Sequence, residues 1–429
     1  MSGILIEQKN NCWSLRLFLL AVSIAVVAQT QGVNSVVGQE AKSFGEDLAF
    51  LKSHTAIVEL ASGNGAGRIL VAPAWQGRVM TSTCGGSKGA SFGWINYPLV
   101  EKGISPEDKR EGLEKHIYVF GGEERLWLGP EGGQFSLFFP EGSKTYEFET
   151  WKTPAVLDTE PFDVVEKSGQ SVSLRKKSHL TNTAGTKLEF QIDRTVSVLE
   201  NDDVEKLLGT SIDKSLATVA FQSSNRLTNT GKVSWKAESG VPSIWLLGML
   251  KPAADVVMAI PFQSEGSGTK VATDYFGPIK NDRLKVGEQI AYFKGDGKYR
   301  AKIGIPAARA KSVCGSYSPS QKTLTLIKFN LPGDAKDLPY VRSQWKHHEK
   351  PYAGDVVNCY NDGPPELGAK PLGPFYELES SSPALALMPN GSYTHVQTTI
   401  HFTGSAKALD EISKSTLGVG LDEIVGAFK

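Results

Sequence analysis

The sequence predicts an all-β protein, and three observations support this. From Ala56 to about Phe402 the chain consists of short runs rich in β-branched and aromatic residues, separated by Gly, Pro, Asn and Asp. Many runs alternate apolar and polar residues, most clearly Lys187–Leu199, where Leu188, Phe190 and Ile192 share one side. No comparable helical block and no Pro/Ser-rich linker interrupts the series. We therefore expect one large antiparallel two-sheet domain over residues 56–405.

The N-terminal end has a different composition. After Lys9 and Arg16, the run Leu17–Ala28 is almost wholly apolar and about a dozen residues long. A bilayer span needs about 20 residues, so this run has the dimensions of a signal-peptide core. We expect residues 1–28 to be a signal peptide and the protein to be exported, to the periplasm or outside the cell, without stable membrane insertion after cleavage. An uncleaved membrane anchor is the alternative.

Helices are expected only near the two ends. Residues 29–55 form an N-terminal extension in which Ser43–His54 fits a short helix, with Ser43 as N-cap and Glu46 as its capping-box partner. Residues 406–429 fit one or two amphipathic helices, broken at Gly418 and Gly420, that cap the sandwich.

Charge and motif content exclude several classes of partner and cofactor. Lys+Arg and Asp+Glu are both 46, so no excess of positive charge indicates nucleic acid. The chain has no CxxC pair, Cys/His zinc spacing, HExxH, P-loop or dinucleotide fingerprint, and we expect no metal or cofactor. Of the four cysteines, Cys84, Cys314 and Cys359 follow the leader, and three buried thiols are favoured over one disulfide.

The segment Gly121–Gly133 is the first candidate for ligand binding. Glycines in it permit close approach of a ligand, and it contains Arg125, Trp127 and Glu131. An indole ring can cover the C–H face of a sugar, while Arg and Glu hydrogen-bond its hydroxyls. The alternative is a hairpin turn with a buried Trp and an Arg–Glu pair.

A second candidate lies at the end of a predicted strand. Alternation places Asn358, Tyr360 and Asp362 on one face and Cys359 on the other. Ordinary loop polarity is the alternative.

The third candidate is Phe375–Phe402, a short strand, a loop and a long alternating strand. Glu377 and Glu379 share a face about 6.6 Å apart, and carboxylates this close can become one acid and one base. His395 and His401 lie on the polar side of the second strand and could shuttle protons. The alternative is a solvated sheet surface.

This third segment resembles the C-terminal part of galactose mutarotase-like (aldose 1-epimerase-like) proteins. The resemblance rests on Leu378-Glu379 and the Leu387–Gly391 turn, with Gly121–Glu131 and Asn225–Trp235 in the expected order. It implies a large antiparallel β-supersandwich and assigns Glu379 as general base. The family's acid histidine belongs near Asn229 and is missing here; His395 or His401 is left to replace it.

The sequence thus predicts an exported carbohydrate-binding protein of mutarotase-like fold. We expect a sugar-active enzyme of the epimerase, hydrolase or lyase type, with Glu379, Glu377 and His395 as catalytic residues. The alternative is a non-catalytic carbohydrate-binding or structural envelope protein, so whether the chain is an enzyme stays open. The residues expected to bind the sugar are Arg125, Trp127, Glu131, Asn358, Tyr360, Asp362 and His401.

Overall fold

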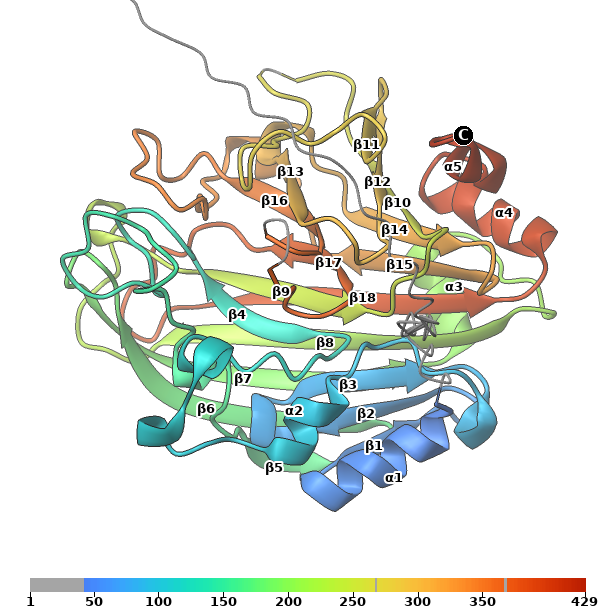
Figure 1. Ribbon diagram of the computed structural model, residues 1–429, viewed down its shortest axis with the longest axis horizontal. Helices are drawn as coiled ribbons and strands as arrows, with labels where there is room; N and C mark the ends of the chain where they lie inside the picture. The colour runs from blue at the N-terminus through green and yellow to red at the C-terminus, as the bar shows by residue number, and fades with distance from the viewer. Residues whose placement is uncertain (1–41, 267, 366–368) are drawn as a thin grey trace, which may run out of the picture. The chain divides into compact units, whose positions relative to one another are not determined.

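The structure is a computed structural model that describes residues 42–429, except 267 and 366–368 (Figure 1). The predicted signal peptide, residues 1–28, lies outside the described residues, as do residues 29–41 of the extension that follows it. Among the helices of the described part, none combines the length and the apolar character that crossing a bilayer requires.

The described chain is built from three antiparallel sheets, which confirms the predicted all-β class. The three-stranded sheet consists of β1 (Val58–Ala61), β2 (Arg68–Ala72) and β3 (Arg78–Thr83). The five-stranded sheet has the order β13 (Ala301–Pro306), β16 (Asp355–Asn361), β17 (Tyr376–Ser381), β9 (Ser243–Leu250) and β4 (Arg125–Gly129). The ten-stranded sheet has the order β11 (Leu284–Val286), β12 (Ile290–Lys294), β10 (Val257–Pro261), β14 (Val313–Ser318), β15 (Thr323–Phe329), β18 (Ser392–Thr403), β8 (Ala217–Asn229), β7 (Lys187–Leu199), β6 (Ser171–Thr181) and β5 (Asp163–Lys167).

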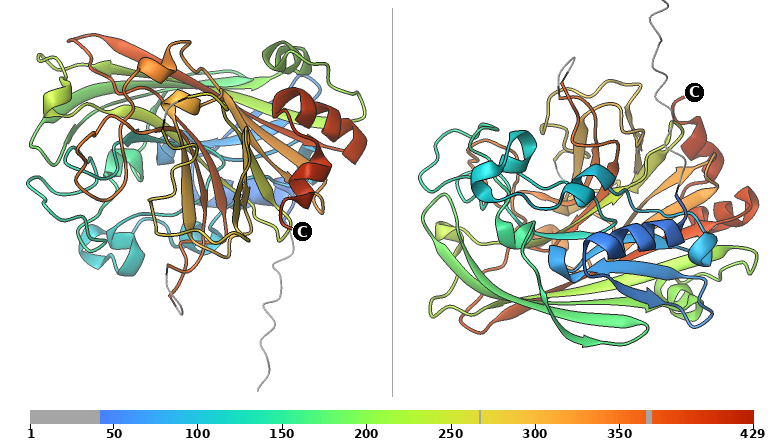
Figure 2. Two further views of the ribbon diagram at one scale, coloured as in Figure 1. Left: turned by 90° about the horizontal axis from the view of Figure 1, so that it is seen from above. Right: turned by 60° about the horizontal axis from the view of Figure 1, so that its bottom comes forward.

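The small third sheet is an addition to the expected pair of sheets. It carries α1 (Phe44–His54) and α2 (Tyr97–Lys102) on its surface, as Figure 2 shows, and the three elements share a separate apolar cluster. The predicted capping box of α1 is present: the Glu46 backbone N–H donates to Ser43 Oγ, and Glu46 accepts from the Ser43 backbone N–H.

Helices also cover part of the outer face of the ten-stranded sheet. The predicted C-terminal helices are α4 (Ala406–Thr416) and α5 (Leu421–Gly426), and they lie beside β14 and β15 (Figure 1). Together with α3 (Asn201–Leu208) they bury Leu324, Ile400 and Phe402 of the sheet in one apolar cluster.

The ten-stranded and five-stranded sheets pack face to face, and strand alternation supplies their shared interior. In β7, Leu188, Phe190 and Ile192 are buried while Lys187 and Glu189 are exposed, as the pattern predicted. The three cysteines of the described chain, Cys84, Cys314 and Cys359, are buried and free, also as expected.

Candidate functional site

One face of the five-stranded sheet gathers charged side chains from four of its five strands. Residues paired across antiparallel strands point to the same side of a sheet. The pairing runs from Gly304 in β13 through Asn358 in β16, Glu379 in β17 and Leu247 in β9 to Arg125 in β4. The neighbouring row contains Lys302, Tyr360 and Glu377. We call this surface the charged face.

Glu379 lies at the centre of the charged face and is fully buried. Lys302 Nζ donates to both of its carboxylate oxygens, at 2.9 and 3.1 Å, and Trp245 Nε1 donates to Oε2 at 2.8 Å. The ammonium group also lies 4.5 Å from the centre of the Trp245 ring. A cation and an indole N–H therefore both bind this carboxyl group.

Glu377 lies on the same face but in a different electrostatic environment. Arg125 Nη2 donates to its Oε1 at 2.6 Å. Burial raises the pKa of Glu377 to about 7; Arg125 opposes the rise, while the negative charge of Glu379 adds to it. A carboxyl group with a pKa near neutrality can act as a proton donor.

A third carboxyl group, Asp355, closes the β13 side of the charged face. Tyr275 O–H donates to Asp355 Oδ2 at 2.5 Å, and Asn358 Nδ2 donates to the Tyr275 hydroxyl oxygen at 2.8 Å. A Cβ on Gly304 would lie 2.2 Å from Asp355 Oδ2, so only glycine leaves room for this carboxyl group. Burial raises the pKa of Asp355 to about 6.

Asp362 extends the face just beyond β16. Tyr360 O–H donates to its Oδ1 and the Gly373 backbone N–H donates to its Oδ2, both at 2.8 Å. Burial raises the pKa of Asp362 to about 6, against the effect of these hydrogen bonds.

Aromatic residues and loop segments cover the charged face. The Trp127 ring packs edge-on against Trp245 at 5.5 Å, and the Arg125 guanidinium lies 4.7 Å from the Trp127 ring centre. Glu131 follows β4 and hydrogen-bonds Trp345. Reduced exposure to water raises the pKa of Glu131, whereas Lys302 lowers it.

Two of the covering loops are joined to each other by Asp274. This aspartate, one residue before Tyr275, accepts hydrogen bonds from Lys346 Nζ at 2.8 Å, Gln344 Nε2 at 3.2 Å and Arg342 Nη2 at 3.5 Å. The segment that places Tyr275 over the charged face is therefore tied to the loop before β16. Side chains of the charged face are almost completely buried under this cover.

A family of unknown function, DUF6786, matches residues 42–428 of the chain. The chain belongs to this family. No curated protein matches it.

Solved structures similar to this DUF6786 protein include galactose mutarotase-like proteins, the neighbours that the sequence resemblance predicted. A protein from Synechocystis has a TM-score of 0.47 and 12% identity, with 82% of this chain and 96% of that chain covered. A galactose mutarotase-like protein from Lactobacillus casei has a TM-score of 0.45 and 12% identity, with coverage of 81% and 100%. A galactose mutarotase related enzyme from Lactobacillus acidophilus has a TM-score of 0.44 and 9% identity, with 81% of this chain and 98% of that chain covered. At these values the likeness assigns no site residue.

The DUF6786 structure brings most of the predicted site residues together. Those on or beside the charged face are Glu377, Glu379, Arg125, Trp127, Glu131, Asn358, Tyr360 and Asp362.

The two predicted histidines lie elsewhere. Ser380 Oγ is 2.8 Å from His395 Nε2, and Ser380 points to the opposite side of β17 from Glu379. His401 Nε2 lies 2.5 Å from Glu123 Oε1, and both are buried between the two large sheets. The polar side of β18 faces this interior, so the expectation that His395 acts with Glu379 and that His401 binds the sugar does not fit the geometry. Burial also lowers the pKa of His395 to about 3.

Sequence reasoning missed four members of the site: Lys302, Trp245, Tyr275 and Asp355. The sequence contains an indication of Lys302, because a charged residue stands between Ala301 and Ile303 in an otherwise apolar strand. It contains none of Trp245, since Trp245 lies in a continuous apolar run whose residues are all buried.

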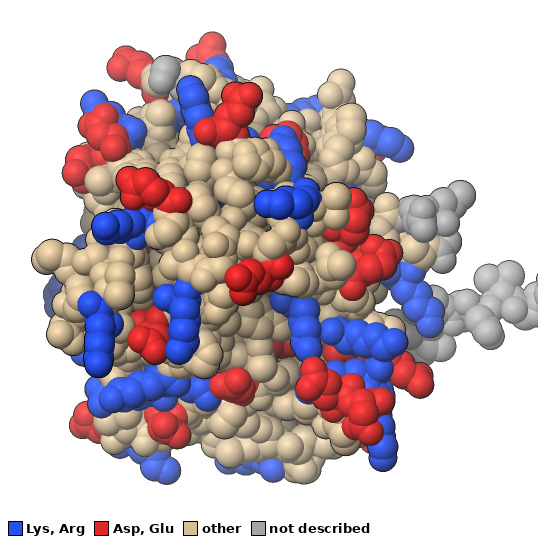
Figure 3. Space-filling model, turned by 90° about the vertical axis from the view of Figure 1, so that its left-hand side faces the viewer, with Lys and Arg blue, Asp and Glu red and all other residues tan. Residues whose placement is uncertain are grey.

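Charges of both signs are mixed on the surface of the described residues. On the side shown in Figure 3, Lys and Arg alternate with Asp and Glu instead of forming one patch of a single sign. Among the residues that the structure describes, no group of three or more His, Cys, Asp or Glu is placed to hold a metal ion.

Proposed function

We propose that this DUF6786 protein is a sugar-active enzyme whose site is the charged face. The observation that carries the proposal is the pair Glu377 and Glu379, two buried carboxyl groups on one side of one strand, each bound by its own cation, Arg125 or Lys302. In the proposed reaction Glu379 accepts a proton, from the anomeric hydroxyl in an epimerisation, from water in a hydrolysis or from a C–H group in an elimination, and Glu377 donates one to the ring or glycosidic oxygen. The reaction class is an epimerisation, a hydrolysis or an elimination.

Several neighbouring groups support a carbohydrate as the ligand. Trp127 and Trp245 offer ring faces, and Asn358, Asp355 and Arg125 offer hydrogen-bonding groups suited to hydroxyls. The Tyr275 hydroxyl group hydrogen-bonds Asp355 and Asn358. A sugar hydroxyl could take its place and make the same two hydrogen bonds. A ligand therefore enters by displacing the segment that carries Tyr275.

One observation favours a second candidate, a carbohydrate-binding protein without catalysis. Both oxygens of Glu379 are already paired with Lys302, and its side chain is fully buried. A carboxylate held in this way has a structural role unless a ligand opens the cover.

The two candidates can be separated with the purified chain and a panel of free sugars and oligosaccharides. Binding is measured by calorimetry and turnover by proton NMR of the anomeric signals. If the first proposal holds, Glu379→Gln lowers turnover by about 100-fold or more while binding persists. Glu189→Gln, an exposed glutamate on the other large sheet, is the control and leaves turnover unchanged.

Each other outcome decides against one candidate. Binding by the wild type with no turnover of any ligand supports the second candidate. If no member of the panel binds, or if Glu379→Gln turns substrate over as fast as the wild type, the enzyme proposal is wrong.

We also propose that the protein is exported, because of the apolar run Leu17–Ala28. N-terminal sequencing of the protein recovered from cell fractions is the test. A mature chain that begins near Gln29 in the periplasmic or extracellular fraction supports export, whereas a cytoplasmic chain beginning at residue 1 or 2 contradicts it.

A further inference from the structure

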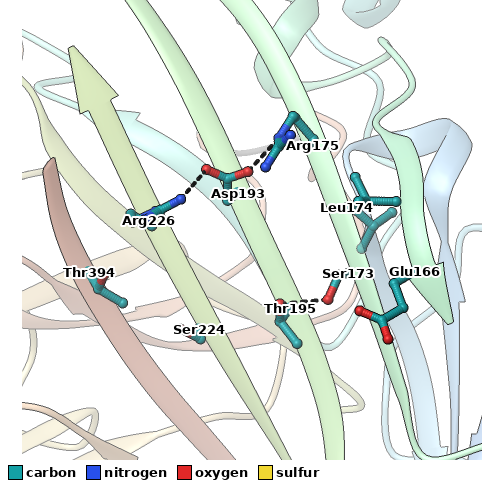
Figure 4. Close-up of a pocket in the computed structure, with 10 residues that line it drawn as sticks. Glu166, Ser173, Leu174, Arg175, Asp193, Thr195, Ser224, Arg226 and Thr394 are labelled. Atoms are coloured by element: carbon teal, nitrogen blue, oxygen red, sulfur yellow. Dashed lines mark hydrogen bonds and ion pairs between the residues drawn. The ribbon is translucent and has the colours of Figure 1, made fainter. Parts of the chain in front are cut away.

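Part of the outer face of the ten-stranded sheet is not covered by helices, and the reaction proposed above does not use it. At one end of this face α3, α4 and α5 bury the sheet. At the other end β6, β7, β8 and β18 line an open hollow of about 350 Å³ (Figure 4). The hollow lies on the opposite sheet from the charged face.

A row of charged side chains crosses the hollow from strand to strand. Arg175, Asp193, Arg226 and Thr394 are paired in register across β6, β7, β8 and β18. Arg175 Nε donates to Asp193 Oδ1 at 2.6 Å, and Arg226 Nη2 donates to Asp193 Oδ2 at 3.1 Å (Figure 4). Two guanidinium groups therefore share one carboxylate, and the row carries a net positive charge.

A second row, next to the first, contains only small hydroxyl side chains on three strands. Ser173, Thr195 and Ser224 are paired in register, and the Ser173 and Thr195 hydroxyl groups lie 3.0 Å apart. Residues two apart on a strand are separated by about 6.6 Å, so the two rows run parallel at that spacing. The short side chains leave the hollow open, and their hydroxyls are both donors and acceptors.

The arginines keep unused donors that point to solvent. Their side chains are 45% exposed for Arg175 and 51% exposed for Arg226. Within the described residues, Asp193 engages one nitrogen of each guanidinium, and the others are left for a ligand. Planar N–H groups of arginine match a carboxylate in bidentate geometry. Glu166 lines the β5 side of the hollow and disfavours an anion there, so the anionic groups of a ligand belong over the arginine row.

We infer that this hollow binds an extended polysaccharide that carries carboxylate groups, a polyuronate. Its carboxylates bind Arg175 and Arg226, and its hydroxyls bind the row of Ser173, Thr195 and Ser224. The hollow is open across four strands, which suits a chain segment better than a single small molecule. This binding is independent of the reaction proposed at the charged face.

Affinity electrophoresis of the purified chain in gels containing polygalacturonate tests the inference. The double variant Arg175→Gln/Arg226→Gln weakens binding by about tenfold or more, because it removes both charged hydrogen-bonding groups. The control Lys177→Gln/Lys187→Gln removes the same charge from exposed positions of β6 and β7 outside the hollow and changes binding less than about twofold. Ser224→Trp, which fills the hollow without changing its charge, also abolishes binding.

Other results overturn the inference. Equal retardation by neutral dextran would show that the carboxylates play no part, and equal retardation by dextran sulfate would indicate a general attraction to polyanions. Equal losses in the arginine and lysine double variants would indicate diffuse charge in place of a site. Thermal unfolding of each variant shows whether it is folded. If the arginine double variant is unfolded, the result with Ser224→Trp decides the inference. Glu379→Gln keeps full polygalacturonate binding, so failure of the proposed reaction and failure of this inference are distinguishable.

Discussion

Lys302 on β13 reaches over β16 to bind both carboxylate oxygens of Glu379 on β17, at 2.9 and 3.1 Å. The two side chains are 8% and 1% exposed, so neither charge is compensated by water. The pair links three strands of the five-stranded sheet. Loss of one partner leaves the other as an isolated buried charge.

Lys302→Met is therefore expected to destabilise the protein by about 3–5 kcal/mol, as measured by urea unfolding at pH 7. The double variant Lys302→Met/Glu379→Gln loses less than the sum of the two single variants, because it leaves no unpaired charge. Lys176→Met removes the partly exposed pair with Glu160 and serves as control, with an expected loss of about 0–1 kcal/mol. Additive losses in the double variant would show that the pair is not coupled.

The two neighbouring tryptophans should respond differently to the same substitution. Trp245 Nε1 donates to Glu379, so Trp245→Phe removes a hydrogen bond to a buried charge and costs about 1–3 kcal/mol. Trp127 Nε1 is buried and has no partner among the described residues. Trp127→Phe therefore loses ring area but no hydrogen bond, and its loss of stability is smaller. Equal losses, measured by denaturant unfolding, would contradict the hydrogen bond to Glu379.

His395 is expected to make the protein sensitive to acid. Its pKa is lowered to about 3 in the folded state by burial, against about 6.5 when unfolded. The stability that depends on neutral His395 is fully present above pH 6.5 and is lost as the pH falls toward 3. His395→Gln cannot gain this charge, so its melting temperature falls less than that of the wild type between pH 7 and pH 4.5.

Buried carboxyl groups with raised pKa values make the folded protein less stable as the pH rises, which is the opposite of the effect of His395. They do not prevent the comparison of the wild type with His395→Gln. The pKa of Glu377 is raised to about 7 and that of Asp355 to about 6, so their contributions are lost as the pH rises through those values. Both groups are present in the wild type and in His395→Gln. The difference between the two melting curves therefore reports His395, and parallel curves would contradict a buried neutral histidine.

Asp274 is expected to control how often the cover over the charged face opens. Asp274→Asn weakens the contacts with Lys346 and Arg342, and amide hydrogen exchange should become faster in residues 271–277 and 340–350. Global stability changes by only about 0–1 kcal/mol, because these ion pairs are exposed. Glu107→Gln, which removes the exposed pair with Lys152, is the matched control. Unchanged exchange in both segments would show that Asp274 does not hold them.

Local patterns predicted much of this fold. Alternation in β7 and the capping box of α1 depend on residues close in sequence, and both are present. Alternation also placed Glu377 with Glu379, and Asn358 with Tyr360, on shared faces. The third sheet was not predicted, because short strands carry no mark of the sheet to which they belong.

The predictions that do not fit the structure depend on which face of a strand points toward the neighbouring sheet. His395 and His401 alternate correctly with apolar residues, but the polar side of β18 faces the interior of the protein and lies away from Glu379. Lys302 and Asp355 join the site through pairing with distant strands, which alternation within one strand cannot reveal. Trp245 lies in a strand that is buried along its whole length and shows no alternation.

The separation of Arg125 from Glu377 has a consequence for the biogenesis of the protein. The two residues are 252 positions apart in sequence, yet their side chains meet at 2.6 Å. Four strands of the five-stranded sheet can be synthesised before β17, but the charges of Arg125 and Lys302 meet their partners only after residue 379 has been made. Contacts of such high sequence separation are slow to form. Until then the nascent chain carries two unpaired cations on a surface that will be buried, and a chain truncated before β17 cannot acquire the charged face.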